Sequence, residues 1–206
     1  MNETTKKILL IILEFISLSL LTLIVPAAIY YDIIYMANDR LYENSATEWL
    51  QILFLFISAM LFLRIAIKDK TSRGLYALAS GLFIAMIIRE GNNFFNALPI
   101  HEIWETLVFI TLSTSIVIAF RNKNTFIQPL IKYSTYKSFT YIMLGLVITL
   151  IFSRLFGTGT LWNPILEFLT TDAKVATIKN IIQEGLELLG YSIIAYGSFI
   201  QTRLYK

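Results

Sequence analysis

Charged and amide side chains interrupt five of the apolar segments in the chain, and these residues are the ones best able to do chemistry. Glu184 and Glu187 lie three residues apart, and Arg89 is followed directly by Glu90. Residues three or four apart share one face of a helix, so the first two carboxylates can point to the same neighbour. Two close carboxylates need a counter-charge, which can be an arginine, a metal ion or a shared proton.

The whole candidate site is larger and draws on all five segments. An ionised side chain at the middle of a bilayer costs roughly 2.5–3.5 kcal/mol on insertion scales, so such residues persist where they pair, line a wet cavity or have a function. The carboxylates, amides and single imidazole of the set are a hard-oxygen environment suited to Mg, Ca, Mn or Fe, so the cofactor that it allows is a divalent metal ion. We predict an ion or metal site formed by Glu48, Glu90, His101, Glu105, Glu184 and Glu187, with Arg89, Asn92, Asn93, Arg154 and Gln183 in support.

The elements that must position these residues are membrane helices. Of the 206 residues, 56% are hydrophobic and only 15% are charged, and the mean hydropathy is +0.67. This balance excludes most water-soluble folds. A helix that crosses a bilayer needs about 20 mostly apolar residues. We therefore predict an all-α integral membrane protein, a single domain over residues 1–206 built as a bundle of six transmembrane helices at about 8–29, 46–67, 75–95, 103–120, 139–156 and 177–200.

Prolines and one long connection mark the limits of these helices. Pro26 falls inside the first apolar segment, where it can kink the helix or end it. Pro129 lies in a polar link between the fourth and fifth helices. The longest connection runs from Gly157 to Ala176, and its Trp162 and apolar neighbours predict a short amphipathic segment at the outer interface.

The basic residues set the predicted orientation. If the N-terminus is cytoplasmic, 12 of the 17 basic residues lie on the inner side of the membrane. The positive-inside rule then places both termini in the cytoplasm. Because helix direction alternates, the whole candidate site lies in the outer half of the membrane, and we expect a multi-pass protein of the cell inner (plasma) membrane.

The composition also excludes several chemistries. Without cysteine the chain has no disulfide, no iron–sulfur cluster and no thiol nucleophile, and a single histidine cannot make a bis-histidine haem site. No lysine lies in mid-membrane to hold retinal, and no clustered basic face predicts nucleic-acid binding. The expected partners are the lipid bilayer and either a homo-oligomer or another membrane protein. For a non-catalytic partner subunit, Gly185, Gly190 and Gly197 fit a small-residue packing face on the last helix.

Two short segments carry a local family resemblance. They are Arg89-Glu90-Gly91 and Gln183-Glu184-Gly185-Leu186-Glu187. Both are similar to the Arg-Glu-x-x-Glu motifs of the oxidase-coupled iron permeases, where two such motifs on separate membrane helices handle ferric iron. The resemblance implies that Glu90, Glu184 and Glu187 are ligands. Asn93 stands in place of the second acid of one motif, Gln183 in place of the arginine of the other, and the chain has one helix fewer than the family.

Each polar residue also has a simpler interpretation. Glu48 and Glu105 stand in first helical turns, where a carboxylate favours the helix dipole, Trp49 and Trp104 suit the interfacial belt, and Arg154 can snorkel outward. Three functions remain open: a protein that binds or conducts a cation (a divalent metal or a proton), an intramembrane metal-dependent enzyme acting on a lipid or lipid-linked group, and a non-catalytic partner or sensor subunit. The acidic layer favours the first.

Overall fold

Helices make up the part of the protein that the computed structural model describes, which is residues 2–35, 45–96, 103–121, 123–158, 161–162 and 175–204. No strand occurs within these ranges, and the all-α prediction is confirmed. The elements are α1 (Glu3–Tyr35), α2 (Ala46–Lys68), α3 (Arg73–Glu90), α4 (Asn92–Asn96), α5 (Ile103–Arg121), α6 (Asn124–Tyr133), α7 (Lys137–Val147), the π-helical turn η1 (Ile148–Phe152), α8 (Ser153–Phe156) and α10 (Val175–Arg203).

Four stretches of the described residues are long and apolar enough to cross a membrane. They are α1, α2, α5 and the continuous run Lys137–Phe156, which joins α7, η1 and α8. Large apolar side chains face outward on these stretches, for example Phe15 at 71% and Phe109 at 72% exposure. An apolar exterior of this extent is favourable in hydrocarbon and unfavourable in water, so the protein is a membrane protein.

Some helix boundaries differ from the predicted ones. The first helix extends beyond 8–29 at both ends, and Pro26 does not end it: the helix continues to Tyr35. The third segment was predicted to reach about residue 95, but α3 ends at Glu90. There the Gly91 N–H donates to Ile87 O at 2.9 Å, and α4 begins after it. Asparagines after a glycine favour local turns over continuation of a helix, which explains the earlier end.

The polar link predicted around Pro129 is instead the short helix α6. Phe126, Leu130 and Tyr133 follow one another at the spacing of a single helical face, and all three line the apolar space between α6, α3 and α7. Pro129 is buried inside α6. The packing of this apolar face outweighs the hydrogen bond that proline cannot donate.

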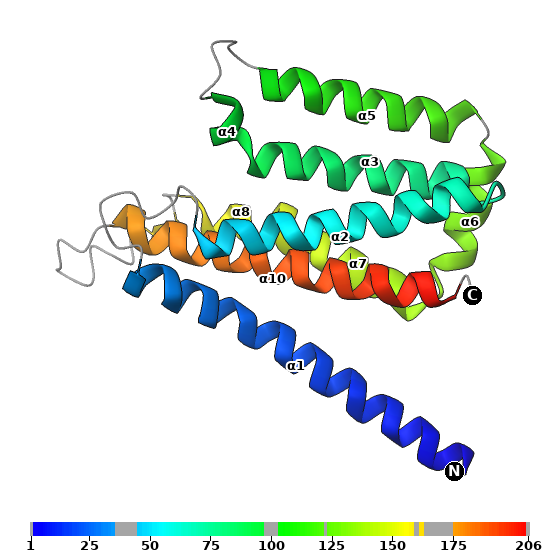
Figure 1. The fold of residues 1–206 in the computed structure, drawn as a ribbon, viewed down its shortest axis with the longest axis horizontal. Helices are drawn as coiled ribbons and strands as arrows, with labels where there is room; N and C mark the ends of the chain where they lie inside the picture. The colour runs from blue at the N-terminus through cyan, green and yellow to red at the C-terminus, as the bar shows by residue number, and fades with distance from the viewer. Residues whose placement is uncertain are drawn as a thin grey trace.

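The long helices lie nearly side by side, as Figure 1 shows. α3 packs between α2 and α5, and α10 contacts α1, α2, α7, η1 and α8. α1 lies against α10 and α2 by its C-terminal end and diverges from them toward the N-terminus (Figure 1). Because α10 touches most of the bundle, its polar side chains can meet residues that are distant in the sequence.

Glycines let α10 approach α7 closely. A methyl group added to Gly145 of α7 would lie 2.6 Å from the carbonyl oxygen of Gly190, and one added to Gly197 would lie 2.9 Å from Ser138 O. Small residues of this kind allow backbones of membrane helices to come together. Gly190 and Gly197, which were expected to mark a packing face, therefore pack α10 against α7 of the same chain. Gly185 faces Ile29 of α1 instead.

Among the described residues, two acidic side chains of α1 attach it to the bundle by hydrogen bonds. The buried Asp32 carboxylate accepts hydrogen bonds from Ala46 N (2.7 Å), Thr47 N (3.0 Å) and Thr47 Oγ1 (2.6 Å), so it caps the start of α2 from another helix. An anion at this end also favours the helix dipole. Glu14 accepts hydrogen bonds from Tyr141 OH (2.5 Å) and Lys137 Nζ (3.1 Å), both on α7.

Asp32→Ala is expected to detach the end of α1 and to lower the free energy of unfolding by about 1–2 kcal/mol, the usual cost of losing a helix cap. The chain has no cysteine, so a single cysteine placed at Ala28, which is 6% exposed, can report this contact. A thiol reagent should label that cysteine faster in the Asp32→Ala protein. Asp69→Ala is the matched control, because Asp69 accepts hydrogen bonds from Thr71 at the opposite end of α2. Equal labelling rates with and without Asp32 would contradict this role.

Candidate functional site

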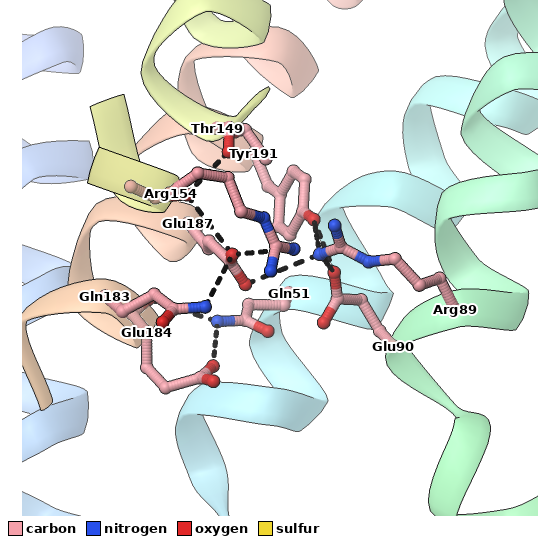
Figure 2. A network of polar contacts seen from close by, with 10 residues as sticks. Gln51, Arg89, Glu90, Thr149, Arg154, Gln183, Glu184, Glu187 and Tyr191 are labelled. Carbon is pink, nitrogen blue, oxygen red and sulfur yellow. Dashed lines mark hydrogen bonds and ion pairs between the residues drawn. The ribbon is translucent and has the colours of Figure 1, made fainter. Parts of the chain in front are cut away.

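Glu187, on α10, lies at the centre of the network of polar contacts in Figure 2. Its side chain is only 2% exposed. Oε1 lies 3.2 Å from Arg154 Nη2, 3.2 Å from Ser153 Oγ and 3.4 Å from Gln183 Nε2. Oε2 lies 3.5 Å from Arg89 Nη2. Two arginines from different helices therefore share one buried carboxylate.

The second carboxylate of the network, Glu90, is held by Arg89 and Tyr191. Arg89 Nη2 pairs with Glu90 Oε1, and Tyr191 OH donates a hydrogen bond to the same oxygen at 2.5 Å. Arg89 Nη2 also donates to Tyr191 OH at 3.2 Å. Tyr191 stands one helical turn after Glu187, so the carboxylate and the phenol of α10 reach the same guanidinium.

Two carboxylates and two guanidiniums thus form a charge-balanced cluster. We call Arg89, Glu90, Arg154 and Glu187 the ion-pair cluster. Removing one partner from a buried pair typically costs about 3–5 kcal/mol, because the other charge is left uncompensated. Two close acids on α10 require a counter-charge. For Glu187, Arg89 and Arg154 supply it.

The π-helical turn η1 sets the position of the residues that reach Glu187 from the side of α8. Ser153 Oγ lies 2.5 Å from Thr149 O, one turn earlier, and 3.2 Å from Glu187 Oε1. A π-helical turn holds more residues than an α-helical turn, so it rotates the following segment about the helix axis. In this position Ser153 and the next residue, Arg154, both contact the same carboxylate.

Glu184 has a different environment from Glu187. Gln51 Nε2, on α2, donates to Glu184 Oε2 at 2.9 Å and to Glu184 O at 3.1 Å. Among the described residues, no arginine or lysine forms an ion pair with Glu184. Gln51 is fully buried, and its Oε1 has no hydrogen-bond partner in the described part of the chain. A buried acceptor without a donor costs about 1–3 kcal/mol.

These groups border one cavity of about 460 Å³. The described part of its wall contains four carboxylates and two guanidiniums, and the guanidiniums contact Glu90 and Glu187 but not Glu184, so carboxylates are in excess among these residues. In surroundings of low dielectric such an excess attracts a cation. The lining residues are Ser45, Glu48, Gln51, Arg89, Glu90, Asn92, Trp104, Arg154, Gln183, Glu184 and Glu187.

Most of the residues predicted for the site meet at this cavity, but not all. Glu105 is exposed on α5 and is not among the lining residues, because its neighbour Trp104 takes the inward position on that helix. His101 and the side chain of Asn93 lie outside the described residues. The residues that do line it are Glu48, Glu90, Glu184, Glu187, Arg89, Asn92, Arg154 and Gln183.

The structure also bears on the metal ligands that the sequence suggested. In the part of the chain that the structure describes, no group of three or more His, Cys, Asp or Glu side chains is arranged to hold a metal ion. Of the three acids that the iron-permease resemblance implies as ligands, Glu90 and Glu187 are paired with arginines. Glu184 is the member of that set held by an amide instead.

Sequence reasoning did not assign three residues that the structure brings into the site. Gln51 follows Glu48 by three residues, Tyr191 follows Glu187 by four, and Ser153 directly precedes Arg154. Helical spacing from an acid was the available signal for Gln51 and Tyr191. No comparable signal marked Ser153, because its approach to Glu187 depends on the π-helical turn.

The fold and the site define a helical membrane protein with a charged, polar cavity among its helices. No protein-family model, no curated protein and no solved structure matches the chain. Function is therefore inferred from the chemistry of the cavity.

Proposed function

We propose that the protein is a multi-pass protein of the cell inner (plasma) membrane, with six transmembrane helices and both termini in the cytoplasm, whose outward-facing acidic site binds or conducts a cation. The observation that carries this proposal is the composition of the cavity wall. The arginines there contact Glu90 and Glu187, while Glu184 in the same wall is held by the amide of Gln51. The excess of negative charge borders the cavity of about 460 Å³, which is large enough to admit a cation.

The charges at the helix ends support the proposed orientation. Lys68, Arg121 and Arg203 lie in the last turns of α2, α5 and α10, at the ends opposite the cavity. Basic residues of this kind favour the cytoplasmic side. Its two acids help to make α10 more polar than the other long helices. The contacts of α10 with α2, α7 and α8 keep these acids inside the bundle, where intramembrane charges are tolerated.

Glu184 is the group that we assign to the cation. Gln51 positions its carboxylate by two hydrogen bonds that place no opposing charge on it. The ion-pair cluster beside it holds α3, α8 and α10 together and keeps the two arginines engaged with Glu90 and Glu187. A proton or a divalent metal ion arriving from outside then meets a carboxylate that needs a positive charge.

Cation flux into liposomes that contain the purified protein tests this function. With dyes for protons and for divalent cations, Glu184→Gln is expected to reduce flux at least about tenfold, because a neutral amide cannot balance the charge of a desolvated cation. Glu105→Gln makes the same chemical change on the exposed side of α5 and is expected to leave flux unchanged. Metal content by mass spectrometry of the two variants separates a metal ion from a proton. Flux and metal content that are both unaffected by Glu184→Gln would refute the proposal.

A further inference from the structure

We propose that the cavity binds the primary ammonium group of an amine, which is held by the Glu184 carboxylate and by the side-chain amide oxygen (Oε1) of Gln51. This inference rests on the proposed function, because it uses the same acidic cavity, and it assigns that cavity an organic cation beside the proton and the metal ion. The group can belong to a free amine or to the headgroup of an aminophospholipid, and the binding chemistry is the same for both. Three features of the cavity carry the inference: an unsatisfied acceptor, an excess of carboxylates and a tryptophan in its lining.

The unsatisfied acceptor is Gln51 Oε1. Gln51 is 0% exposed, and its Nε2 donates to both the side chain and the carbonyl of Glu184. Rotation of the amide by 180° would set its oxygen against these two acceptors, so the amide orientation is determined by Glu184. Oε1 therefore points away from Glu184, on the side of the amide that faces Glu90 in Figure 2. No described residue donates to it.

An ammonium group fits both needs of this position. It carries three N–H donors and no acceptor, so one N–H can satisfy Gln51 Oε1 while another donates to the Glu184 carboxylate. Its single positive charge offsets part of the excess negative charge of the wall. Hydrogen bonds between charged partners are stronger than neutral ones, which favours the ammonium over a water molecule in the same place.

The remaining wall suits an organic cation. Trp104 lines the same cavity, and an indole attracts a cation placed over its face. The volume of about 460 Å³ leaves room for the carbon atoms that follow the nitrogen. A quaternary ammonium would also interact with Trp104 and with the carboxylates, but it has no N–H to donate to Gln51 Oε1. Preference for a primary over a quaternary ammonium is thus the distinguishing property of this site.

Isothermal titration of the full-length protein in phosphatidylcholine nanodiscs tests the inference, with ethanolamine and tetramethylammonium as the probes. Ethanolamine is expected to bind at least about tenfold more tightly, the difference that one charged hydrogen bond provides. Glu184→Gln and Gln51→Leu should each weaken ethanolamine binding by about tenfold or more, and Glu105→Gln should leave it unchanged. Thermal unfolding of each variant checks that it is folded. The preference for ethanolamine over tetramethylammonium is measured on the parent protein, so this part of the test does not depend on how the variants fold.

Equal affinity for the two probes, no binding of ethanolamine, or ethanolamine binding that survives Glu184→Gln would overturn the inference. If ethanolamine does not bind but proton or metal flux is lost in Glu184→Gln, the inference fails and the proposed function stands. If neither binding nor flux is found, both fail. Repeating the titration in phosphatidylethanolamine nanodiscs identifies the source of the group: weaker apparent binding there shows that the lipid headgroup competes for the cavity, and unchanged binding shows that a free amine is the ligand.

Discussion

Glu187→Leu is expected to lower the free energy of unfolding by about 3 kcal/mol, because it leaves two arginines facing a buried position without their carboxylate. Arg89 keeps Glu90 as a partner, and Arg154, which is 47% exposed, can turn toward water, so the effect lies at the lower end of the usual range. Glu187→Gln should cost less, since an amide still accepts hydrogen bonds from Ser153 and one arginine. Equilibrium unfolding in mixed micelles measures both changes.

A double-mutant cycle separates the ion pair from loss of packing at the same site. Arg154→Met in the Glu187→Leu background removes the uncompensated guanidinium, so the double variant is expected to regain part of the stability that Glu187→Leu loses. Glu105→Leu, at an exposed acid on α5, is the control for removing a carboxylate from the protein and should change stability little. Additive effects of the two cluster substitutions would show that Arg154 and Glu187 do not stabilise each other.

Gly190→Ala is expected to destabilise the contact between α10 and α7 by about 1–3 kcal/mol, the usual cost of forcing an extra carbon into a packed interface. The new methyl group would clash with Thr149 Oγ1 and lie 2.8 Å from the backbone carbonyl of Gly145. A side chain can rotate away, but a backbone carbonyl moves only with its helix. Thermal unfolding in detergent measures the loss.

Gly185→Ala is the matched control for this prediction. It makes the same change on the same helix, and the atom nearest to its methyl group is Ile29 Cδ1 at 2.8 Å, the end of a flexible side chain. Its cost should therefore be small. Thr149→Ala combined with Gly190→Ala should recover only part of the stability, because the Gly145 carbonyl remains in place. A Gly190→Ala protein as stable as Gly185→Ala would show that the helices separate without cost.

The helices themselves were largely predictable from the chain. Apolar runs of bilayer length located α2, α5 and Lys137–Phe156 to within about two residues, because burial in hydrocarbon depends on composition summed over a segment. The predictions failed where one local contact outweighs composition. Gly91 ends α3 before the predicted boundary at about residue 95, and Asp32 binds the start of α2 at a point that no hydropathy pattern marks.

The sequence predicts which residues share the layer of the candidate site, but not which of them contact one another. Chain direction and helical spacing were enough to expect Glu90, Glu184, Glu187 and Arg89 in one layer, since these depend on counting residues along each helix. Rotation of each helix about its own axis is decided by packing. Glu105 and Trp104 are adjacent in the sequence, and only packing of α5 on α3 sets which one lines the cavity.

The sequence by itself determined that this is a helical membrane protein and that its costly polar residues gather at one end of the helices, because both follow from the free energy of placing each side chain in hydrocarbon. The tertiary structure alone decided how those residues are paired. Close glycine contacts and the π-helical turn bring Arg154 to Glu187, while Gln51 donates a hydrogen bond to Glu184. Electrostatic energy depends on distances of a few ångströms between separate helices, and such distances exist only once the helices have packed.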